Sequence, residues 1–149
     1  MYALTGRLLF KIATPIIRLI LMHSSRVYVI IEHEGKVLFV KNWLSVQDWR
    51  LPGGGKHVHE TWLMAGLREV QEELGFMLDQ KSLKELSEGV WETNGFNYNY
   101  KIMHIKCLQK PKIKRAYLEL IAVSWLDPKQ LKGDITPEIF RSLLAAGLI

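Results

Sequence analysis

A glycine-rich segment followed by an acidic amphipathic stretch constrains this chain more than any other feature of its sequence. Residues 51–76, "LPGGGKHVHETWLMAGLREVQEELGF", place three consecutive glycines before a run of charged residues. Apolar residues recur in it at the i, i+4, i+7 and i+11 positions, which predicts a helix from about Thr61 to Leu74 with one face in the core. These apolar residues are Leu63, Leu67, Val70 and Leu74. Thr61 suits the N-cap, and Gly75 suits the left-handed position that ends a helix.

Three carboxylates gather on a different face of this predicted helix: Glu69, Glu72 and Glu73. Like charges three or four residues apart repel each other by a few tenths of a kcal/mol per pair, and a bound cation would offset that repulsion. Carboxylate oxygens are the ligands that Mg²⁺ and Mn²⁺ prefer. A solvated acidic face is the alternative interpretation.

The residues around these carboxylates favour access for a ligand. Ala65 and Gly66 precede the acidic residues by about one turn, and we expect their small size to let a ligand approach. We also expect residues 53–55 to form a loop that turns sharply and exposes backbone carbonyls or amides to the same spot.

The spacing of the polar residues in this stretch is that of a known family signature. The matching residues are Gly54, Glu60, Arg68, Glu69, Glu72, Glu73 and Gly75, with apolar Val70 and Phe76 between and after them. In this spacing the chain resembles the Nudix hydrolases. The resemblance implies an α/β fold, namely an α/β/α sandwich with a mixed sheet. It also implies an enzyme that hydrolyses the diphosphate of a nucleoside diphosphate linked to another group.

The resemblance also implies roles for individual residues. Glu72 and Glu73 are expected to bind Mg²⁺ or Mn²⁺, Glu69 to bind the metal or act as the base, and a carbonyl near Gly53 or Gly54 to join them. Arg68 is expected to orient Glu69 or Glu60 through charge-assisted hydrogen bonds. His59 stands where the family often has glycine, and Gly66 where it often has alanine, but neither change removes a ligand.

The flanking sequence predicts the sheet of this domain, which we place at residues 23–149. Two β-branched runs joined at "HEGK" predict a hairpin over Arg26 to Asn42, and a short strand is expected from Trp49 to Leu51. Three further strands are expected in "LKELSEGVWETN", "YNYKIMHIKCLQ" and "AYLELIAVSWL". The closing stretch "TPEIFRSLLAAGLI" predicts a helix capped by Thr136 with Pro137 at its first position.

An apolar segment with a narrow basic stripe precedes this domain, and we assign residues 1–22 to a separate N-terminal helix. Arg7, Lys11 and Arg18 interrupt it and Pro15 kinks it, which argues against a transmembrane span or a signal peptide. The wide apolar arc favours burial on its own domain or on a second subunit, giving a homodimer. Contact of the basic stripe with a membrane surface is the less favoured alternative.

Composition limits the remaining possibilities. A 149-residue chain that is 48% hydrophobic and 23% charged suits one globular domain. Its single cysteine, Cys107, cannot form an internal disulfide, so a reducing, cytoplasmic compartment is expected. The net charge of +5 suits an anionic ligand but does not choose between a nucleotide, a nucleic acid and a membrane.

Substrate recognition is expected to come from residues outside the signature. We single out Trp62 and Trp49 for stacking on a base, and Lys112 in the basic loop "LQKPKIKRAY" for a phosphate. For both tryptophans, packing in the core is the competing interpretation. A small nucleotide diphosphate is the expected substrate and DNA is not an expected partner. Removal of pyrophosphate from RNA 5′ ends and a non-catalytic nucleotide-sensing module are the alternatives.

Overall fold

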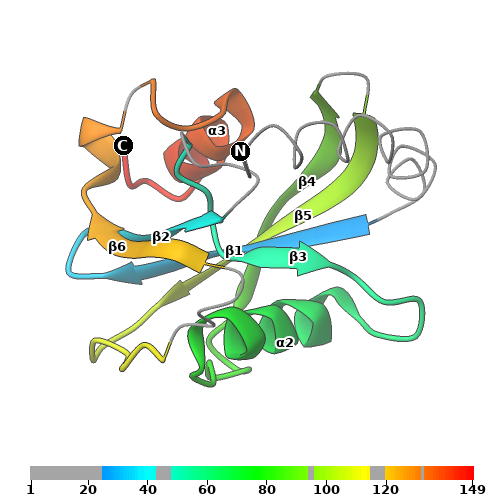
Figure 1. The fold of residues 1–149 in the computed structure, drawn as a ribbon, viewed down its shortest axis with the longest axis horizontal. Coiled ribbons are helices and arrows are strands. Elements are labelled where there is room, and N and C mark those ends of the chain that lie inside the picture. The colour runs from blue at the N-terminus through cyan, green and yellow to red at the C-terminus, as the bar shows by residue number, and fades with distance from the viewer. Residues whose placement is uncertain (1–24, 43–47, 94–95, 115–119, 132) are drawn as a thin grey trace, which may run out of the picture.

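The computed structural model describes residues 25–42, 48–93, 96–114, 120–131 and 133–149, without the side chains of residues 92, 93 and 96. These described residues form six strands and two α-helices (Figure 1). The strands are β1 (Ser25–His33), β2 (Lys36–Asn42), β3 (Gly53–Gly55), β4 (Lys84–Thr93), β5 (Phe96–Lys106) and β6 (Leu120–Leu126). The helices are α2 (Trp62–Leu74), α3 (Pro137–Ala145) and the short 3₁₀ helix η1 (Pro128–Gln130).

The strands form one mixed sheet in the order β4-β5-β1-β2-β6, with β3 pairing to β1 outside this path. β1 and β5 run parallel, whereas the pairs β1–β2, β2–β6, β4–β5 and β1–β3 are antiparallel. In Figure 1 helix α2 covers one side of the sheet and helix α3 the other. The predicted α/β/α sandwich with a mixed sheet is therefore confirmed.

Alternation along β1 divides the core between the two sides of the sheet. Val27, Val29 and Ile31 pack into a cluster with α2, while Tyr28 and Ile30 pack into a second cluster with α3. Since successive side chains of a strand point to opposite faces, a central strand covered on both sides has apolar residues on both, as β1 has from Val27 to Ile31. The continuous β-branched run that predicted this strand follows from that burial.

Helix α2 begins and ends as its sequence predicts. The Oγ1 atom of Thr61 accepts a hydrogen bond of 3.2 Å from the backbone N–H of Met64. Gly75 takes a left-handed conformation with φ of 70° and donates its N–H to the carbonyl of Gln71. At helix α3, by contrast, Thr136 occupies the N-cap position but makes no capping hydrogen bond with its side chain.

The glycine segment is a strand, so the prediction of a sharply turning loop at residues 53–55 is wrong. Gly53 pairs with Tyr28 and Gly54 with Val27, antiparallel to β1. Gly53 has φ of +142°, and a Cβ there would overlap the carbonyl of Val27. The glycines thus let β3 lie against β1 in a conformation that other residues rarely adopt.

The expectation that Ala65 and Gly66 leave room for a ligand is also wrong. Both residues belong to α2 and are buried on the side of the helix that faces the sheet. A Cβ at position 66 would lie 3.2 Å from Sδ of Met103 and 3.4 Å from Cγ2 of Val29. Their small size therefore lets the helix approach the sheet, and the predicted core residues Leu63 and Leu67 are only partly buried at the edge of this contact.

The short strand expected at Trp49–Leu51 is reduced to a single bridge between Arg50 and Val40. The predicted N-terminal helix of residues 1–22, the dimer and membrane contacts assigned to it, and the part of the last predicted strand before Leu120 lie outside the described residues. Within the described ranges, no helix combines the length and the apolar character that a membrane crossing needs.

Candidate active site

Arg68 stands at the centre of the signature residues, where strand β3, the loop after it and helix α2 meet. Its Nη2 atom donates to Oε1 of Glu60 at 2.7 Å and to the carbonyl of Gly55 at 2.7 Å. Its Nη1 atom donates to Oε1 of Glu69 at 2.9 Å and to Oε2 of Glu72 at 3.0 Å. The expected contact of Arg68 with Glu69 or Glu60 is confirmed for both carboxylates. One guanidinium thus joins three acidic side chains to the backbone of β3.

Glu60 is held from two directions. Besides Arg68, the backbone N–H of His57 donates to Oε1 of Glu60 at 2.6 Å. The hydrogen bonds from Arg68 are the main cause that lowers the pKa of Glu60 to about 2. The same hydrogen bonds raise the pKa of Arg68 above its usual range. Glu60 is therefore an anion at neutral pH that neutralises Arg68 and fixes the loop between β3 and α2.

Two glutamates of α2 lie against the glycine strand. Glu73 is buried, with 8% of its surface exposed, and its Oε2 atom accepts the N–H of Gly53 at 2.9 Å. The carboxylate of Glu69 lies beside Gly54, so closely that a Cβ at position 54 would be 2.6 Å from its Oε2 atom. Glycine at position 54 therefore provides the space that the Glu69 carboxylate occupies.

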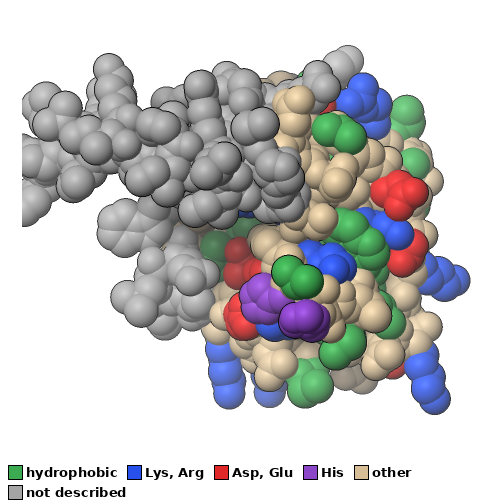
Figure 2. All heavy atoms as spheres, turned by 90° about the vertical axis from the view of Figure 1, so that its right-hand side faces the viewer, with side chains coloured by type: hydrophobic (Ala, Val, Ile, Leu, Met, Phe, Trp, Pro, Cys, Tyr) green, Lys and Arg blue, Asp and Glu red, His purple; other side chains and the backbone are tan. Residues whose placement is uncertain are grey.

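The third glutamate differs in exposure. The side chain of Glu72 is 57% exposed, whereas that of Glu69 is 13% exposed. The loop that carries Glu60 projects to the right in Figure 1, and Figure 2 looks onto that side. There, histidine side chains lie at the surface with acidic and basic side chains around them. This face therefore carries charged side chains of both signs beside the histidines.

These residues fit a divalent cation by their chemistry. The carboxylates of Glu69 and Glu73 lie against Gly54 and Gly53, so two groups of hard oxygen ligands stand beside the backbone of β3. In their present rotamers, however, no three acidic, histidine or cysteine side chains of the described residues converge on one ion position. Arg68 instead supplies the positive charge between Glu69 and Glu72.

The substrate residues expected from the sequence are not brought together. Trp62 packs on the α2 side of the sheet, and Trp49 packs on the α3 side, where Lys41 Nζ lies 4.7 Å from its ring centroid. Lys112 is exposed in the loop after β5. Of the three, Trp62 belongs to the helix that carries the glutamates, at its first position.

Two lysines flank Trp62, and sequence reasoning missed both. Lys56 Nζ and Lys101 Nζ each lie 5.6 Å from the centroid of the Trp62 ring. Lys101 also pairs with Glu85 at 2.7 Å and Glu88 at 3.1 Å, and the hydrogen bond to Glu85 is the main cause that raises its pKa. The sequence contained a signal for the position of Lys101. In strand β5 it lies on the same face as Met103 and Ile105, which are buried on the α2 side of the sheet.

Comparison with known proteins identifies relatives of this architecture. The family model described as NUDIX domain matches residues 22–145. A MutT NUDIX hydrolase from Burkholderia pseudomallei superimposes with a TM-score of 0.72 at 20% identity, over 83% of this chain and 97% of that one. An Ap4A hydrolase from C. elegans does so with a TM-score of 0.70 at 15% identity, over 83% and 95%.

A third solved structure, the E. coli dihydroneopterin triphosphate pyrophosphohydrolase, gives a TM-score of 0.68 at 17% identity, over 82% of this chain and 92% of that one. At these identities the likeness of the solved structures concerns the fold. No curated protein sequence gave a significant match.

Proposed function

Because the chain belongs to the Nudix hydrolase family, we propose that it hydrolyses the diphosphate of a nucleoside diphosphate linked to another group, by attack of water at phosphorus. The observation that carries this proposal is the arrangement around Arg68. It binds Glu60, Glu69 and Glu72 at once, while Glu73 binds the backbone of the adjoining glycine strand. A solvated acidic helix would not need a guanidinium shared among its carboxylates.

The proposed cofactor is Mg²⁺ or Mn²⁺, held by Glu69, Glu72, Glu73 and the carbonyl of Gly54. When bound, such an ion neutralises the charge of the diphosphate, stabilises charge that develops at phosphorus and lowers the pKa of water. Glu72 is the most exposed of these glutamates and is bound to Arg68 from one side only. It is the ligand that we expect to change rotamer most readily when the ion enters.

The chain's own groups have distinct proposed tasks. Glu69 takes the proton from the attacking water, since its carboxylate is positioned by Arg68 and by the space above Gly54. Arg68 is a positioning residue, because Glu60 holds it through two of its nitrogen atoms. Glu73 fixes the distance between α2 and β3 through the N–H of Gly53. Catalysis then depends on preorganised charge and orientation.

Trp62 and its two neighbouring lysines are the best supported substrate contacts. An indole offers a face for a nucleobase, and Lys56 and Lys101 would attract phosphate to the same end of α2. Lys101 is held by two glutamates, so Lys56 is the more available cation of the pair. Trp49 and Lys112 stay weaker proposals because Trp49 packs on the other side of the sheet and Lys112 lies in an exposed loop.

A release screen tests the proposed reaction. Purified protein is incubated with nucleoside triphosphates, nucleotide sugars, dinucleoside polyphosphates and 5′-triphosphorylated or capped RNA, with Mg²⁺ and separately with Mn²⁺. Turnover of at least one of these supports hydrolysis, and Glu69→Gln should abolish it. Saturable nucleotide binding without turnover of any substrate would favour the non-catalytic sensing module instead.

RNA 5′ ends are the second candidate substrate, favoured by the exposed lysines Lys112 and Lys114 in the loop after β5. The dependence of binding on salt concentration distinguishes RNA from a small nucleotide. RNA binding that uses several lysines weakens steeply with ionic strength, whereas binding of a small nucleotide responds less.

The remaining proposals concern the oligomeric state and the cellular location. A homodimer through residues 1–22 and a cytoplasmic location are proposed on the apolar sequence of that segment and on the single cysteine. Cys107 is half-buried, and burial raises the pKa of its thiol, which supports an unreactive structural role.

A further inference from the structure

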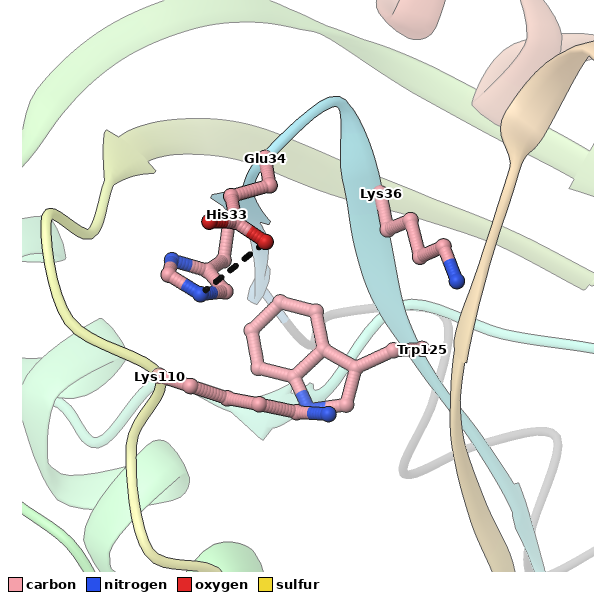
Figure 3. A pocket seen from close by; sticks show the side chains of 5 residues that line it. All are labelled: His33, Glu34, Lys36, Lys110 and Trp125. Atoms are coloured by element: carbon pink, nitrogen blue, oxygen red, sulfur yellow. Dashed lines mark ion pairs between the residues drawn. The ribbon is translucent and has the colours of Figure 1, made fainter.

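A small cavity of about 110 Å³ opens at the turn between β1 and β2. Its lining comes from the end of β1, the turn, the start of β2, the loop after β5, and strand β6 (Figure 3). The lining residues are His33, Glu34, Lys36, Lys110 and Trp125. None of them belongs to the candidate active site, and none was assigned a role by the sequence.

Two hydrogen-bond donors meet in this cavity without an acceptor. The Nε1 atom of Trp125 is buried and has no hydrogen-bond partner among the described residues. Lys110 Nζ lies 5.9 Å from the centroid of the same ring, and Figure 3 draws it on the side of the ring that carries Nε1. A buried N–H loses its hydrogen bonds to water on folding, so an unpaired one is unfavourable unless a ligand accepts from it.

The charge of the lining favours an anion. Lys36 and Lys110 contribute two ammonium groups, and within the described parts of the chain neither forms an ion pair with a carboxylate. Glu34 is the one carboxylate of the lining. Its Oε2 atom lies 3.9 Å from Nε2 of His33, and its side chain is 85% exposed, so it offsets only part of that charge.

The walls of the cavity are fixed by contacts with the rest of the fold. His33 donates from Nδ1 to the carbonyl of Cys107 at 3.0 Å and packs edge-on against Trp125, with ring centroids 5.9 Å apart. Trp125 itself is paired with Leu38 across β2 and β6. His33 and Trp125 therefore form a preformed part of the wall, whereas Lys110 lies on a loop.

We propose that this cavity binds a phosphate group, either free phosphate or the phosphate of a nucleoside monophosphate. A tetrahedral oxyanion offers an acceptor to the Trp125 N–H and to the ammonium group of Lys110, while Lys36 adds a second positive charge to the lining. Strand β1 contacts the glycine strand at Val27 and Tyr28, and His33 follows Tyr28 by roughly 17 Å of extended chain. The cavity is thus a second anion site, separate from the carboxylates of α2.

Indole N–H signals in ¹H–¹⁵N NMR spectra test this proposal on the full chain. The signal of Trp125 is identified by its loss in Trp125→Phe, which keeps an aromatic side chain but removes the N–H donor. Phosphate is then titrated at constant ionic strength against chloride, with a chelator present so that the glutamates of α2 hold no metal. We expect a saturable shift of the Trp125 signal with phosphate and none with chloride.

Lys110→Gln and Lys112→Gln form the matched pair of variants. Lys110 lines the cavity, whereas Lys112 is exposed in the same loop and does not. The first should weaken phosphate binding at Trp125 at least about 10-fold, as expected when a charge-assisted contact is lost, and the second should leave it unchanged. Adenosine monophosphate in place of phosphate assigns the source, since tighter binding would identify a nucleotide phosphate.

A Trp125 signal that does not saturate with either phosphate compound would overturn the proposal. Equal loss of binding in both lysine variants would overturn it as well, because it would show general charge attraction. Glu69→Gln should leave the phosphate titration of the Trp125 signal unchanged, whether or not it stops hydrolysis. The phosphate site and the proposed reaction can therefore be refuted independently.

Discussion

Arg68 and Glu60 form a two-pronged ion pair between helix α2 and the loop that precedes it. Nη2 of Arg68 lies 2.7 Å from Oε1 of Glu60, and Nε lies 3.1 Å from Oε2. Nη1 of Arg68 donates to Glu69 and Glu72, and Nη2 also donates to the carbonyl of Gly55. The pair with Glu60 therefore determines where the guanidinium lies and hence where those carboxylates point. Planar pairing of this kind is specific to arginine.

Acid should weaken the fold through this pair. The pKa of Glu60 is about 2 in the folded chain, below its ordinary value of 4.5, because of the hydrogen bonds from Arg68. A carboxylate with a lowered folded-state pKa contributes stability above its ordinary pKa and loses it as the pH falls toward the folded-state value. Glu60→Gln should therefore lower the free energy of unfolding by about 1–3 kcal/mol at pH 7.

Urea unfolding at pH 7, 4 and 2.5 measures this effect. The difference between wild type and Glu60→Gln should be largest at pH 7 and shrink between pH 4.5 and about 2. Glu138→Gln is the control, since Glu138 forms a single ion pair, at 3.3 Å, with the largely exposed Arg141. A difference between wild type and Glu60→Gln that grows on acidification would contradict the account.

The helix and its caps were predictable because they depend on residues close in sequence. Thr61 and Gly75 act within one turn, and the glutamate spacing of the signature is likewise local. The strand at residues 53–55 was not predictable in this way, since glycine has no side chain to alternate between faces. Its pairing with β1 is a contact across the fold, which no local pattern reports.

The face of α2 that lies on the sheet was misjudged for a related reason. Periodicity marks large apolar residues, so Leu63 and Leu67 were expected in the core and Gly66 at a ligand. The sheet instead needs small residues where the helix comes closest, next to Met103 and Val29. The site carboxylates could be named from their spacing. Their link through Arg68 to the carbonyl of Gly55 required the three-dimensional fold.

Two neighbouring glutamates should differ in their effect on stability. Glu73 is buried and accepts the N–H of Gly53, whereas Glu72 is largely exposed. Glu73→Ala removes the acceptor of the partly buried Gly53 N–H and should lower the free energy of unfolding by about 1–3 kcal/mol. Glu72→Ala should change it by less than about 0.5 kcal/mol, as is usual for surface positions.

Denaturant unfolding without added metal compares these two variants directly. Equal stability losses would show that the contact between Glu73 and Gly53 does not hold the helix to β3. The corresponding glutamine variants should each lose most hydrolytic activity while keeping the fold, because they preserve shape and remove ligand charge.

Two adjacent glycines of β3 provide a matched test of the space around Glu69. A Cβ at position 54 would lie 2.6 Å from the Glu69 carboxylate, whereas one at position 55 meets nothing within 4 Å. Gly54→Ala should displace the flexible Glu69 side chain and reduce turnover by on the order of 100-fold. Gly55→Ala should stay near wild type, and similar activity in both variants would refute this role of Gly54.

Glu69→Gln should reduce kcat by on the order of 10²–10⁴, with a smaller effect on KM, if Glu69 takes the proton from water. An interaction made only in the transition state appears in the rate constant. Steady-state kinetics on the best substrate of the release screen provides the two constants. If the loss appears only in KM, the base lies elsewhere, and Glu92 and Glu119 are the carboxylates to test next.

Metal dependence of hydrolysis tests the central claim most directly, namely that the carboxylates gathered by Arg68 form a divalent-metal hydrolase site. The initial rate is measured against Mg²⁺ and Mn²⁺ concentration, and in excess chelator, for wild type and for Glu72→Gln. We expect a rate that saturates with metal, no turnover in chelator, and a metal requirement at least about 10–100-fold higher in Glu72→Gln. Full turnover of the wild type in chelator, or an unchanged metal requirement in the variant, would contradict the claim.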